Sequence, residues 1–311
     1  MIDTIDRPYT TVILAISADG KIADAARSPA RFGSANDKAH LEQQVADSDA
    51  VLFGNGTLQA YGTTMRVISP ELLKQRELHG KPPQPAQIVC SRSSKFDPNL
   101  RFFQQPVPRW LLTAEGEDGE RGRLGERGRG GEGEIGREGE RGRGGEGERG
   151  RGGEGERGRG GEGEIGGEGE IGGEGGFAIE TPSNSPLPSS SFLLPSSFFL
   201  LPSIFDRTIY AKTAGGEIDW IDGFQQLASL GIKRLAILGG GKLVASVLAA
   251  GLVDELWLTV CPLILGGADA PTPVEGKGFL ADLALKLELL AVKQVGQEVF
   301  LHYKVDRSPH V

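Results

Sequence analysis

A glycine-rich stretch in the middle of the chain limits most strongly what this sequence can fold into. Of the 48 glycines in 311 residues, 29 lie between Ala114 and Gly176, and the unit ERGRGGEG repeats three times from Glu140. A solenoid repeat needs apolar residues to bury, and these units have at most one isoleucine. Ordering so many glycines also carries a high entropic cost. We therefore predict that 114–205 is a low-complexity, mostly disordered insert.

The end of this insert has a different bias. Residues 181–202 alternate short Phe and Leu clusters with Pro and Ser. The prolines exclude a continuous helix, and the apolar clusters either cover the core or promote self-association. The sequence does not choose between these two. The remaining residues, 1–113 and 206–311, are about 220 in number, enough for one well-buried core, so we predict a single split domain.

The net charge belongs mainly to the insert. The window from Ala114 to Gly176 holds 18 acidic residues and 11 arginines, a net charge of −7 out of −8 for the whole chain. The predicted domain is thus nearly neutral, which gives no reason to expect a nucleic-acid ligand. Arg-Gly segments can bind RNA, but here the glutamates outnumber the arginines and would repel phosphate.

Other sequence features indicate the compartment. Cys90 and Cys261 are far apart and form no CxxC motif, so we expect two buried free thiols in a reducing compartment and no metal site. No basic segment followed by an apolar one opens the chain, and no run of eighteen apolar residues occurs. We therefore expect a soluble, cytoplasmic protein that does not bind membranes.

Strand and helix patterns alternate on both sides of the insert. Apolar, β-branched segments predict strands, and amphipathic segments with polar caps predict helices between them. Two further strands separated by Gly296 predict an antiparallel hairpin at the C-terminus. The fold class we predict is three-layer α/β/α, with a mostly parallel central sheet and this hairpin at one edge. The strands are expected at 9–16, 50–53, 87–90, 109–113, 207–211, 233–238, 255–260, 285–293 and 299–305, and the helices at 34–46, 219–230 and 242–250.

The strongest chemical motif is LGGGKL at Leu238–Leu243. It follows an apolar strand and opens a helix, so free backbone N–H groups and the helix dipole would face any group bound there. Three consecutive glycines let a phosphate approach the backbone closely, and Lys242 adds positive charge. The spacing is neither that of a Rossmann GxGxxG turn nor that of a Walker loop. An ordinary tight strand–helix turn is the alternative interpretation.

Two other turns follow predicted strands. Gly54, Gly56 and Thr57 stand after the second strand, where Thr57 either contacts a phosphate or ribose or simply begins a helix. Asp19 lies in the SADGKIA segment after the first strand. It is either a turn residue or a polar group facing a ligand, since ligands of open α/β sheets bind beyond the carboxyl ends of the strands.

No protein-borne chemistry is evident. The chain has no G-x-S-x-G nucleophile elbow and no H-x-E with P-C-x-x-C zinc motif, and its four histidines are scattered. We interpret the histidines as solvated or structural. A phosphate-binding turn without a nucleophile or metal site fits chemistry that a cofactor carries, in which the protein binds and orients the reactants.

These segments together resemble the reductase domain of the bifunctional riboflavin-biosynthesis deaminase/reductase family, which has a dihydrofolate-reductase-like fold. The resemblance rests on SADGKIA at 17–23, DAVLFGNGT at 49–57, AYGTT at 60–64 and the long run LGGGKLVASVLAAGLVDELWLTVCPLILGG at 238–267. It covers the predicted domain and none of the insert.

The resemblance implies an NADPH-dependent reductase that converts 5-amino-6-(5-phosphoribosylamino)uracil to its ribityl product. Asp19 and Met65 would face this substrate. The hydride would pass directly from the nicotinamide to the sugar carbon, with Asp19 or a bound water handling the proton. A homodimer is also implied, and any deamination would come from another chain. The residues implied to hold NADPH are Ala15, Gly54, Thr57, Ser91, Gly239, Gly240, Gly241, Lys242, Leu243, Val244 and Ser246.

The chain departs from the family pattern at three places. Leu238 replaces an acidic residue before the glycine turn, Val45 replaces an arginine late in the first helix, and Tyr61-Gly62-Thr63 replaces a D-D-P sequence. Two alternatives therefore stay open. One is an NADPH reductase of the same fold acting on another small molecule, with Leu238 and Val45 forming an apolar pocket. The other is a non-catalytic nucleotide-binding or scaffold protein in which the insert has the main role.

Overall fold

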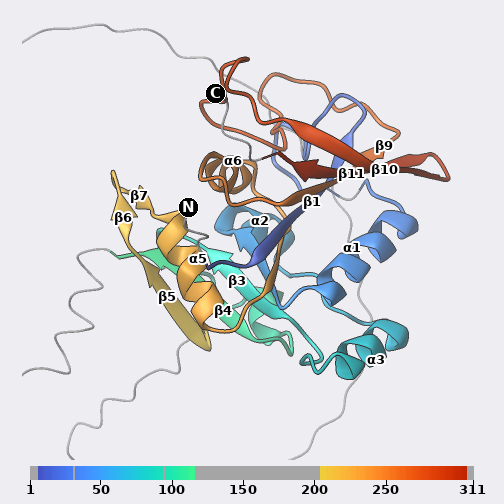
Figure 1. Cartoon of the computed structure of the whole chain (residues 1–311). Helices are drawn as coiled ribbons and strands as arrows, with labels where there is room; N and C mark the ends of the chain where they lie inside the picture. Colours follow the sequence, from blue (N-terminus) through green and yellow to red (C-terminus); the bar gives the residue numbers. More distant parts are fainter. Residues whose placement is uncertain (1–5, 31, 94, 116–203, 307–311) are drawn as a thin grey trace, which may run out of the picture. The chain divides into compact units, whose positions relative to one another are not determined.

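A nine-stranded sheet organises the protein (Figure 1). The computed structural model describes residues 6–30, 32–93, 95–115 and 204–306. The strand order is β10-β11-β9-β1-β8-β2-β3-β4-β5, and the seven strands from β9 to β5 are parallel. Strand β11 is antiparallel to both β9 and β10. The strands are β1 (Tyr9–Ser17), β2 (Ala50–Gly54), β3 (Ala86–Cys90), β4 (Arg109–Ala114), β5 (Arg207–Ala211), β8 (Arg234–Ile237), β9 (Glu255–Cys261), β10 (Leu287–Val295) and β11 (Glu298–Val305).

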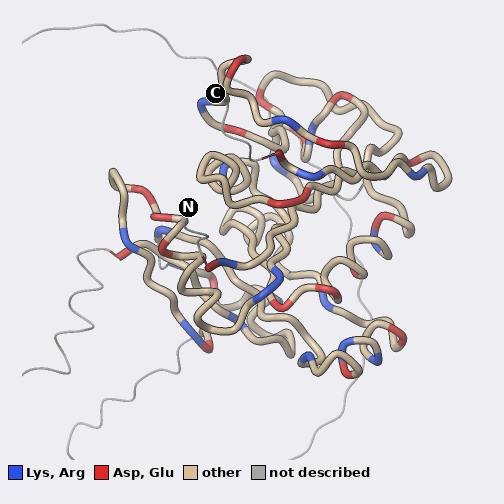
Figure 2. The backbone as a smooth tube through the Cα atoms, viewed as in Figure 1, with Lys and Arg blue, Asp and Glu red and all other residues tan. Residues whose placement is uncertain are grey.

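Helices cover both faces of this sheet (Figure 1). Helices α5 (Trp220–Ser229) and α6 (Gly241–Ala249) bury their apolar residues in a cluster with β1 side chains such as Val12. On the opposite face, α1 (Ala35–Asp47), α2 (Asn55–Tyr61) and α3 (Pro70–Leu78) share a second cluster. The predicted three-layer fold, its mostly parallel sheet and the hairpin at Gly296 are therefore confirmed. Figure 2 shows acidic and basic residues interspersed along the described backbone.

Local sequence explains where the helices begin. The Ser34 hydroxyl accepts hydrogen bonds from the N–H groups of Asn36 and Asp37, and the Asp219 carboxylate does the same at the start of α5. Sequence analysis did not predict α3. The sequence does contain a typical helix start here, because Ser69 caps the helix and Pro70 lies in its first turn.

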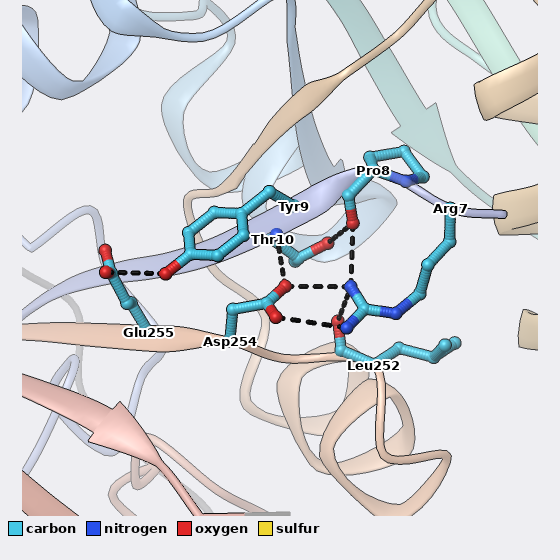
Figure 3. Close-up of polar contacts among 7 residues, drawn as sticks. All are labelled: Arg7, Pro8, Tyr9, Thr10, Leu252, Asp254 and Glu255. Carbon is cyan, nitrogen blue, oxygen red and sulfur yellow. Dashed lines mark hydrogen bonds and ion pairs between the residues drawn. The ribbon is translucent and has the colours of Figure 1, made fainter. Parts of the chain in front are cut away.

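A partly buried ion pair joins the amino ends of β1 and β9 (Figure 3). Both carboxylate oxygens of Asp254 accept from the Arg7 guanidinium, at 2.8 and 3.0 Å, and one also accepts from the Thr10 N–H at 2.7 Å. Beside it, the Tyr9 hydroxyl donates to Glu255 at 2.6 Å. This clamp lies at the end of the sheet opposite the predicted ligand-binding turns.

Two further observations concern the predicted boundaries and pocket residues. A small hairpin, β6 (Thr213–Ala214) and β7 (Glu217–Ile218), was not predicted.

Val45, on α1, is fully buried in the core between this helix and the sheet. It therefore does not line an apolar pocket with Leu238, contrary to the expectation attached to the second hypothesis. The predicted insert at 114–205 lies almost wholly outside the described residues.

Candidate functional site

The carboxyl ends of the central strands bring the two predicted glycine turns together. Because β8 lies between β1 and β2, the turn after β8 is next to the turn after β2. The Gly54 N–H donates to the Gly239 carbonyl at 3.4 Å, and a Cβ built on Gly239 would lie 3.6 Å from the Thr57 hydroxyl. Segments about 185 residues apart in the sequence thus form one surface. We call Gly54–Thr57 and Gly239–Leu243 the glycine half of the site.

The backbone of this half has the properties of an anion site. Gly239 and Gly240 have φ angles of 137° and 90°, a conformation that residues with side chains rarely adopt. No side chain caps α6, because the cap residue is Gly240, and the Val244 N–H donates to the Gly240 carbonyl at 3.0 Å. Uncapped amides at a helix N-terminus favour a negatively charged group.

Gly241 is required for a different reason. A Cβ there would overlap the Thr272 carbonyl oxygen and lie 2.8 Å from the Glu275 side chain. The Glu275 N–H also donates to the Gly241 carbonyl, and its carboxylate pairs with Arg27 at 2.9 Å. The third glycine of the motif therefore accommodates the chain's own loop, which packs on the first turn of α6.

The other predicted cofactor residues contribute unequally. Leu243 and Val244 are buried in the core, so only their backbone faces the turn, whereas Lys242 is exposed. The Ser246 hydroxyl donates to the Lys242 carbonyl within α6. The Ser91 hydroxyl donates to the Ser93 carbonyl at 2.7 Å, at the carboxyl end of β3. Ala15 lies on β1, three residues beyond Val12, which is opposite Ile237 at the end of β8.

Asp19 is held by hydrogen bonds to the loop after β9, the strand next to β1 on the side away from β8. One carboxylate oxygen accepts from the Ser17 hydroxyl at 2.6 Å and the Leu265 N–H at 3.1 Å, and the other accepts from the Gly266 N–H at 2.7 Å. These hydrogen bonds, that of Ser17 foremost, lower the pKa of Asp19 to about 2. Asp19 is therefore an anion at neutral pH and fixes the loop after β9.

Met65 and Leu238 both pack against the sheet face that α1 covers. The Met65 carbonyl accepts from the side-chain amide of Gln87, and the Gln87 carbonyl oxygen accepts from the Thr64 hydroxyl at 2.6 Å. Gln87 is fully buried, so it anchors the loop that carries Met65. Tyr61, one of the departures from the family pattern, donates to the Ala30 carbonyl at 3.0 Å.

Sequence analysis missed a second acidic group at this edge. Glu298, which is 3% exposed, accepts from the Ser34 N–H at 2.7 Å and the Ser34 hydroxyl at 2.5 Å. Burial raises the pKa of the nearby Asp37 carboxyl, the Glu298 charge raises it further, and the Thr259 hydroxyl partly offsets this. No motif indicated the contacts of Asp37 and Glu298, because the residues involved come from α1, β9 and β11. We use the name acid half for Asp19, which binds the loop after β9, together with the separate Asp37–Glu298 pair near the end of β9.

Among the residues that the structure describes, no group of three or more His, Cys, Asp or Glu side chains is placed to hold a metal ion. His40 on α1 and His302 on β11 pack around Trp257, and His302 also lies 3.2 Å from Glu255 at the start of β9. His302 stacks on Trp257 with ring centroids 3.9 Å apart, and His40 meets Trp257 edge-on. None of the helices in the described ranges combines the length and apolar character that crossing a lipid bilayer requires.

Comparison with known families agrees with this architecture. The family model described as the RibD C-terminal domain matches residues 8–123 and 201–301. The chain belongs to this family. The predicted resemblance to the riboflavin-biosynthesis reductases is therefore confirmed.

Individual relatives are named as reductases. The chain is 25% identical over 291 residues to the 2,5-diamino-6-ribosylamino-4(3H)-pyrimidinone 5′-phosphate reductase of Archaeoglobus fulgidus, covering 94% of this chain and 95% of the relative. A protein of the same name from Methanothermobacter thermautotrophicus is 41% identical over 83 residues, 26% of this chain and 38% of that protein. Among solved structures, a pyrimidine reductase-like protein from Corynebacterium diphtheriae has the same fold, with a TM-score of 0.61, 18% identity and coverage of 99% and 96%.

Proposed function

We propose that this protein is an NADPH-dependent reductase of riboflavin biosynthesis that opens the ribose of a ribosylaminopyrimidine phosphate to a ribityl chain. Membership of the RibD C-terminal domain family supports the reductase assignment. The observation that carries the cofactor assignment is the glycine half. There, the uncapped amides of α6 and the Thr57 hydroxyl converge on one surface, as binding of the negatively charged NADPH requires.

The residues divide between cofactor and substrate. Ala15, Gly54, Thr57, Ser91 and the turn and helix start from Gly239 to Ser246 would hold NADPH. Within that run the side chains of Leu243 and Val244 are buried, so their contribution would come from the backbone. Asp19 and Met65 would face the substrate. NADPH supplies a hydride, and the chain's own residues orient the reactants and exclude water.

Two substrates differ at a single position of the pyrimidine ring. Our sequence-based prediction is 5-amino-6-(5-phosphoribosylamino)uracil, which carries an oxygen where the diaminopyrimidinone carries an amino group. The names of the relatives from Archaeoglobus fulgidus and Methanothermobacter thermautotrophicus favour the diaminopyrimidinone as second candidate. Turnover of both compounds by the purified chain, followed by loss of NADPH absorbance, would identify the preferred one.

Binding and turnover together separate the competing functions. Calorimetry should show NADPH binding, and either pyrimidine should then be reduced. NADPH oxidation with other small molecules but with neither pyrimidine would favour a different reductase of this fold. Absence of NADPH binding would refute the reductase proposal and leave a non-catalytic role. Rescue of a riboflavin auxotroph that lacks only the reductase provides an independent test.

The proposal includes a homodimer. Strand β10 forms one edge of the sheet, and Leu287, Leu289 and Val292 on it are 44%, 52% and 57% exposed. An edge strand with exposed apolar side chains on it is suited to pairing with a second copy. Sedimentation of the wild type and of Val292→Glu would test this, with the substitution expected to yield monomers.

The proposal also keeps the predicted domain division and compartment. Residues 1–113 and 206–311 would form one reductase domain, and 114–205 a dispensable insert, as the unmatched residues 124–200 support. Deletion of 114–205 should preserve NADPH binding, and loss of soluble, NADPH-binding protein would refute dispensability. Both cysteines are free, which supports a cytoplasmic location.

A further inference from the structure

The loop after β9 places a carboxylate at the start of α6. The Glu275 N–H donates to the Gly241 carbonyl at 3.2 Å, and a Cβ built on Gly241 would lie 2.8 Å from Cγ and 3.1 Å from Oε2 of Glu275. Because Cα–Cβ bonds in a helix tilt toward its N-terminus, this side chain lies on the amino-terminal side of the first turn. The glycine half therefore has a negative charge beside it.

An ion pair balances this charge. The Glu275 side chain is 16% exposed, and its Oε1 pairs at 2.9 Å with Nη2 of Arg27, whose side chain is 58% exposed. A carboxylate next to the uncapped start of a helix would repel a second anion there, and a guanidinium beside it offsets that repulsion. Arg27 therefore affects how well a phosphate can bind at the glycine half.

Backbone hydrogen bonds hold Arg27 in this position. Its own N–H donates to the Asp24 carbonyl at 2.9 Å, which closes the turn that carries it. The same loop is bonded to the loop after β9, because the Ile22 N–H donates to the Pro271 carbonyl at 2.9 Å. Pro271 and Glu275 belong to one loop, so the guanidinium and the carboxylate are carried by two segments that are fixed to each other.

The ion pair leaves most of the guanidinium available. An arginine presents five N–H donors in a planar fork, and the bond to Glu275 uses one terminal nitrogen. Arg–phosphate pairs are often bidentate, because two N–H groups of the fork match two phosphate oxygens. Arg27 can therefore keep its bond to Glu275 and still offer two donors to a phosphate.

The three-glycine run has a different neighbour at each end. A Cβ built on Gly239 would lie 3.6 Å from the Thr57 hydroxyl, whereas Glu275 lies against Gly241. A phosphate bound to the amides of this run would thus have the Thr57 hydroxyl at one end and the Arg27–Glu275 pair at the other.

We propose that Arg27 binds a phosphate group of the dinucleotide cofactor at the start of α6, and that Glu275 is a positioning residue that holds the guanidinium there. This inference rests on the reductase function proposed above, which assigns the cofactor to the glycine half and gives these two residues no role. Loss of the guanidinium alone would leave the Glu275 carboxylate uncompensated. It should therefore weaken phosphate binding both through a lost contact and through an added repulsion.

The main test is Arg27→Gln in the full-length protein, with Arg207→Gln, an exposed arginine at the amino end of β5, as the matched control. Calorimetry should show NADPH binding weakened about 10-fold to 100-fold in Arg27→Gln, as expected for loss of a hydrogen bond between charged groups. Arg27→Lys keeps the charge without the planar fork, so it should restore part of the affinity. Arg207→Gln should bind NADPH as the wild type does.

A double variant separates this role from a purely structural one. Arg27→Gln combined with Glu275→Gln removes both charges, so it should bind NADPH about threefold to tenfold more tightly than Arg27→Gln alone. If the ion pair only holds the two loops together, removing Glu275 as well cannot restore affinity. A double variant as weak as Arg27→Gln, or weaker, would therefore overturn the proposal. Melting temperatures measured without cofactor show that each variant is folded.

Two cofactors identify which phosphate is bound. A loss of affinity for NADPH and NADH alike in Arg27→Gln would place the guanidinium at the pyrophosphate. A loss for NADPH alone would place it at the 2′-phosphate, because NADH lacks only that group. An unchanged Kd for both cofactors together with a raised KM for the pyrimidine would overturn the proposal, since Arg27 would then bind the substrate instead.

The outcomes also separate this inference from the proposed function. If the wild type binds NADPH and reduces the pyrimidine while Arg27→Gln keeps its Kd for NADPH within about twofold, Arg27 does not bind the cofactor, although the reductase function stands. If the wild type does not bind NADPH at all, the proposed function fails and this inference fails with it.

Discussion

The two halves of the candidate site are built by different physical means. The glycine half uses backbone, since its donors are N–H groups and two of its glycines have conformations that side chains disfavour. The acid half uses side chains from α1, β11 and the loop after β1. A backbone site is encoded in one short segment of sequence, whereas a side-chain cluster depends on how distant segments pack. This explains why a local motif revealed only the first.

The largest effect should come from the clamp of Arg7 and Asp254 at the opposite end of the sheet, which joins β1 to β9. Asp254→Ala removes the carboxylate that pairs with the Arg7 guanidinium. The Arg7 side chain is only 11% exposed, so water replaces this partner poorly. Breaking such a buried pair should lower the free energy of unfolding by about 3 kcal/mol. Urea denaturation would measure it. Glu217→Gln, which breaks an exposed pair with Arg92, should cost less than about 1 kcal/mol.

A substitution in the glycine half should affect the cofactor alone. Gly240 has φ of 90° and ψ of 97°, so an alanine there costs about 1–3 kcal/mol or forces the turn to change shape. We expect Gly240→Ala to weaken NADPH binding about tenfold or more in calorimetry, while the pH profile of kcat stays the same. A changed profile with unchanged NADPH affinity would show that the two halves are not separable in this way.

A smaller effect is expected at Asp19. Asp19→Asn removes the charge that accepts from the Leu265 and Gly266 N–H groups, so the loop should loosen and KM for the pyrimidine should rise about threefold to tenfold. In the wild type, the ionised Asp19 carboxylate stabilises the folded protein. This stabilisation is fully present above the unfolded pKa of about 3.9 and is lost only as the pH falls through about 2. KM should therefore not change with the titration of Asp19 between about pH 5 and pH 8. A change in NADPH affinity instead would place Asp19 in the glycine half.

The smallest effect concerns the thiols. Burial raises the pKa of Cys90 and of Cys261 to about 12 each, so neither forms a thiolate at neutral pH. Alkylating reagents should leave both cysteines of the native protein unmodified for hours, as mass spectrometry would show, and should modify both after denaturation. Rapid native labelling of Cys261 would indicate that the acid half opens to solvent.

Sequence alone determined the fold class and the glycine half. Apolar strand patterns and helix caps depend on residues that are close together in the sequence. These local patterns therefore predicted β1, α1, β8 and α6 correctly. Helix α3 was missed even though Ser69 and Pro70 mark its start.

Tertiary structure decided the partners of the charged residues. The pKa of Asp19 is lowered first by the nearby Ser17 hydroxyl and then by the Leu265 and Gly266 N–H groups, and the pKa of Asp37 is raised first by burial and then by the Glu298 charge. Leu265 and Glu298 lie more than 200 residues from these carboxyl groups in the sequence. Likewise, the need for glycine at 241 comes from the Thr272 carbonyl rather than from the motif itself. Secondary structure follows short-range periodicity and capping, whereas the pKa of a side chain follows its local solvation and neighbouring charges, and only the folded chain brings those together.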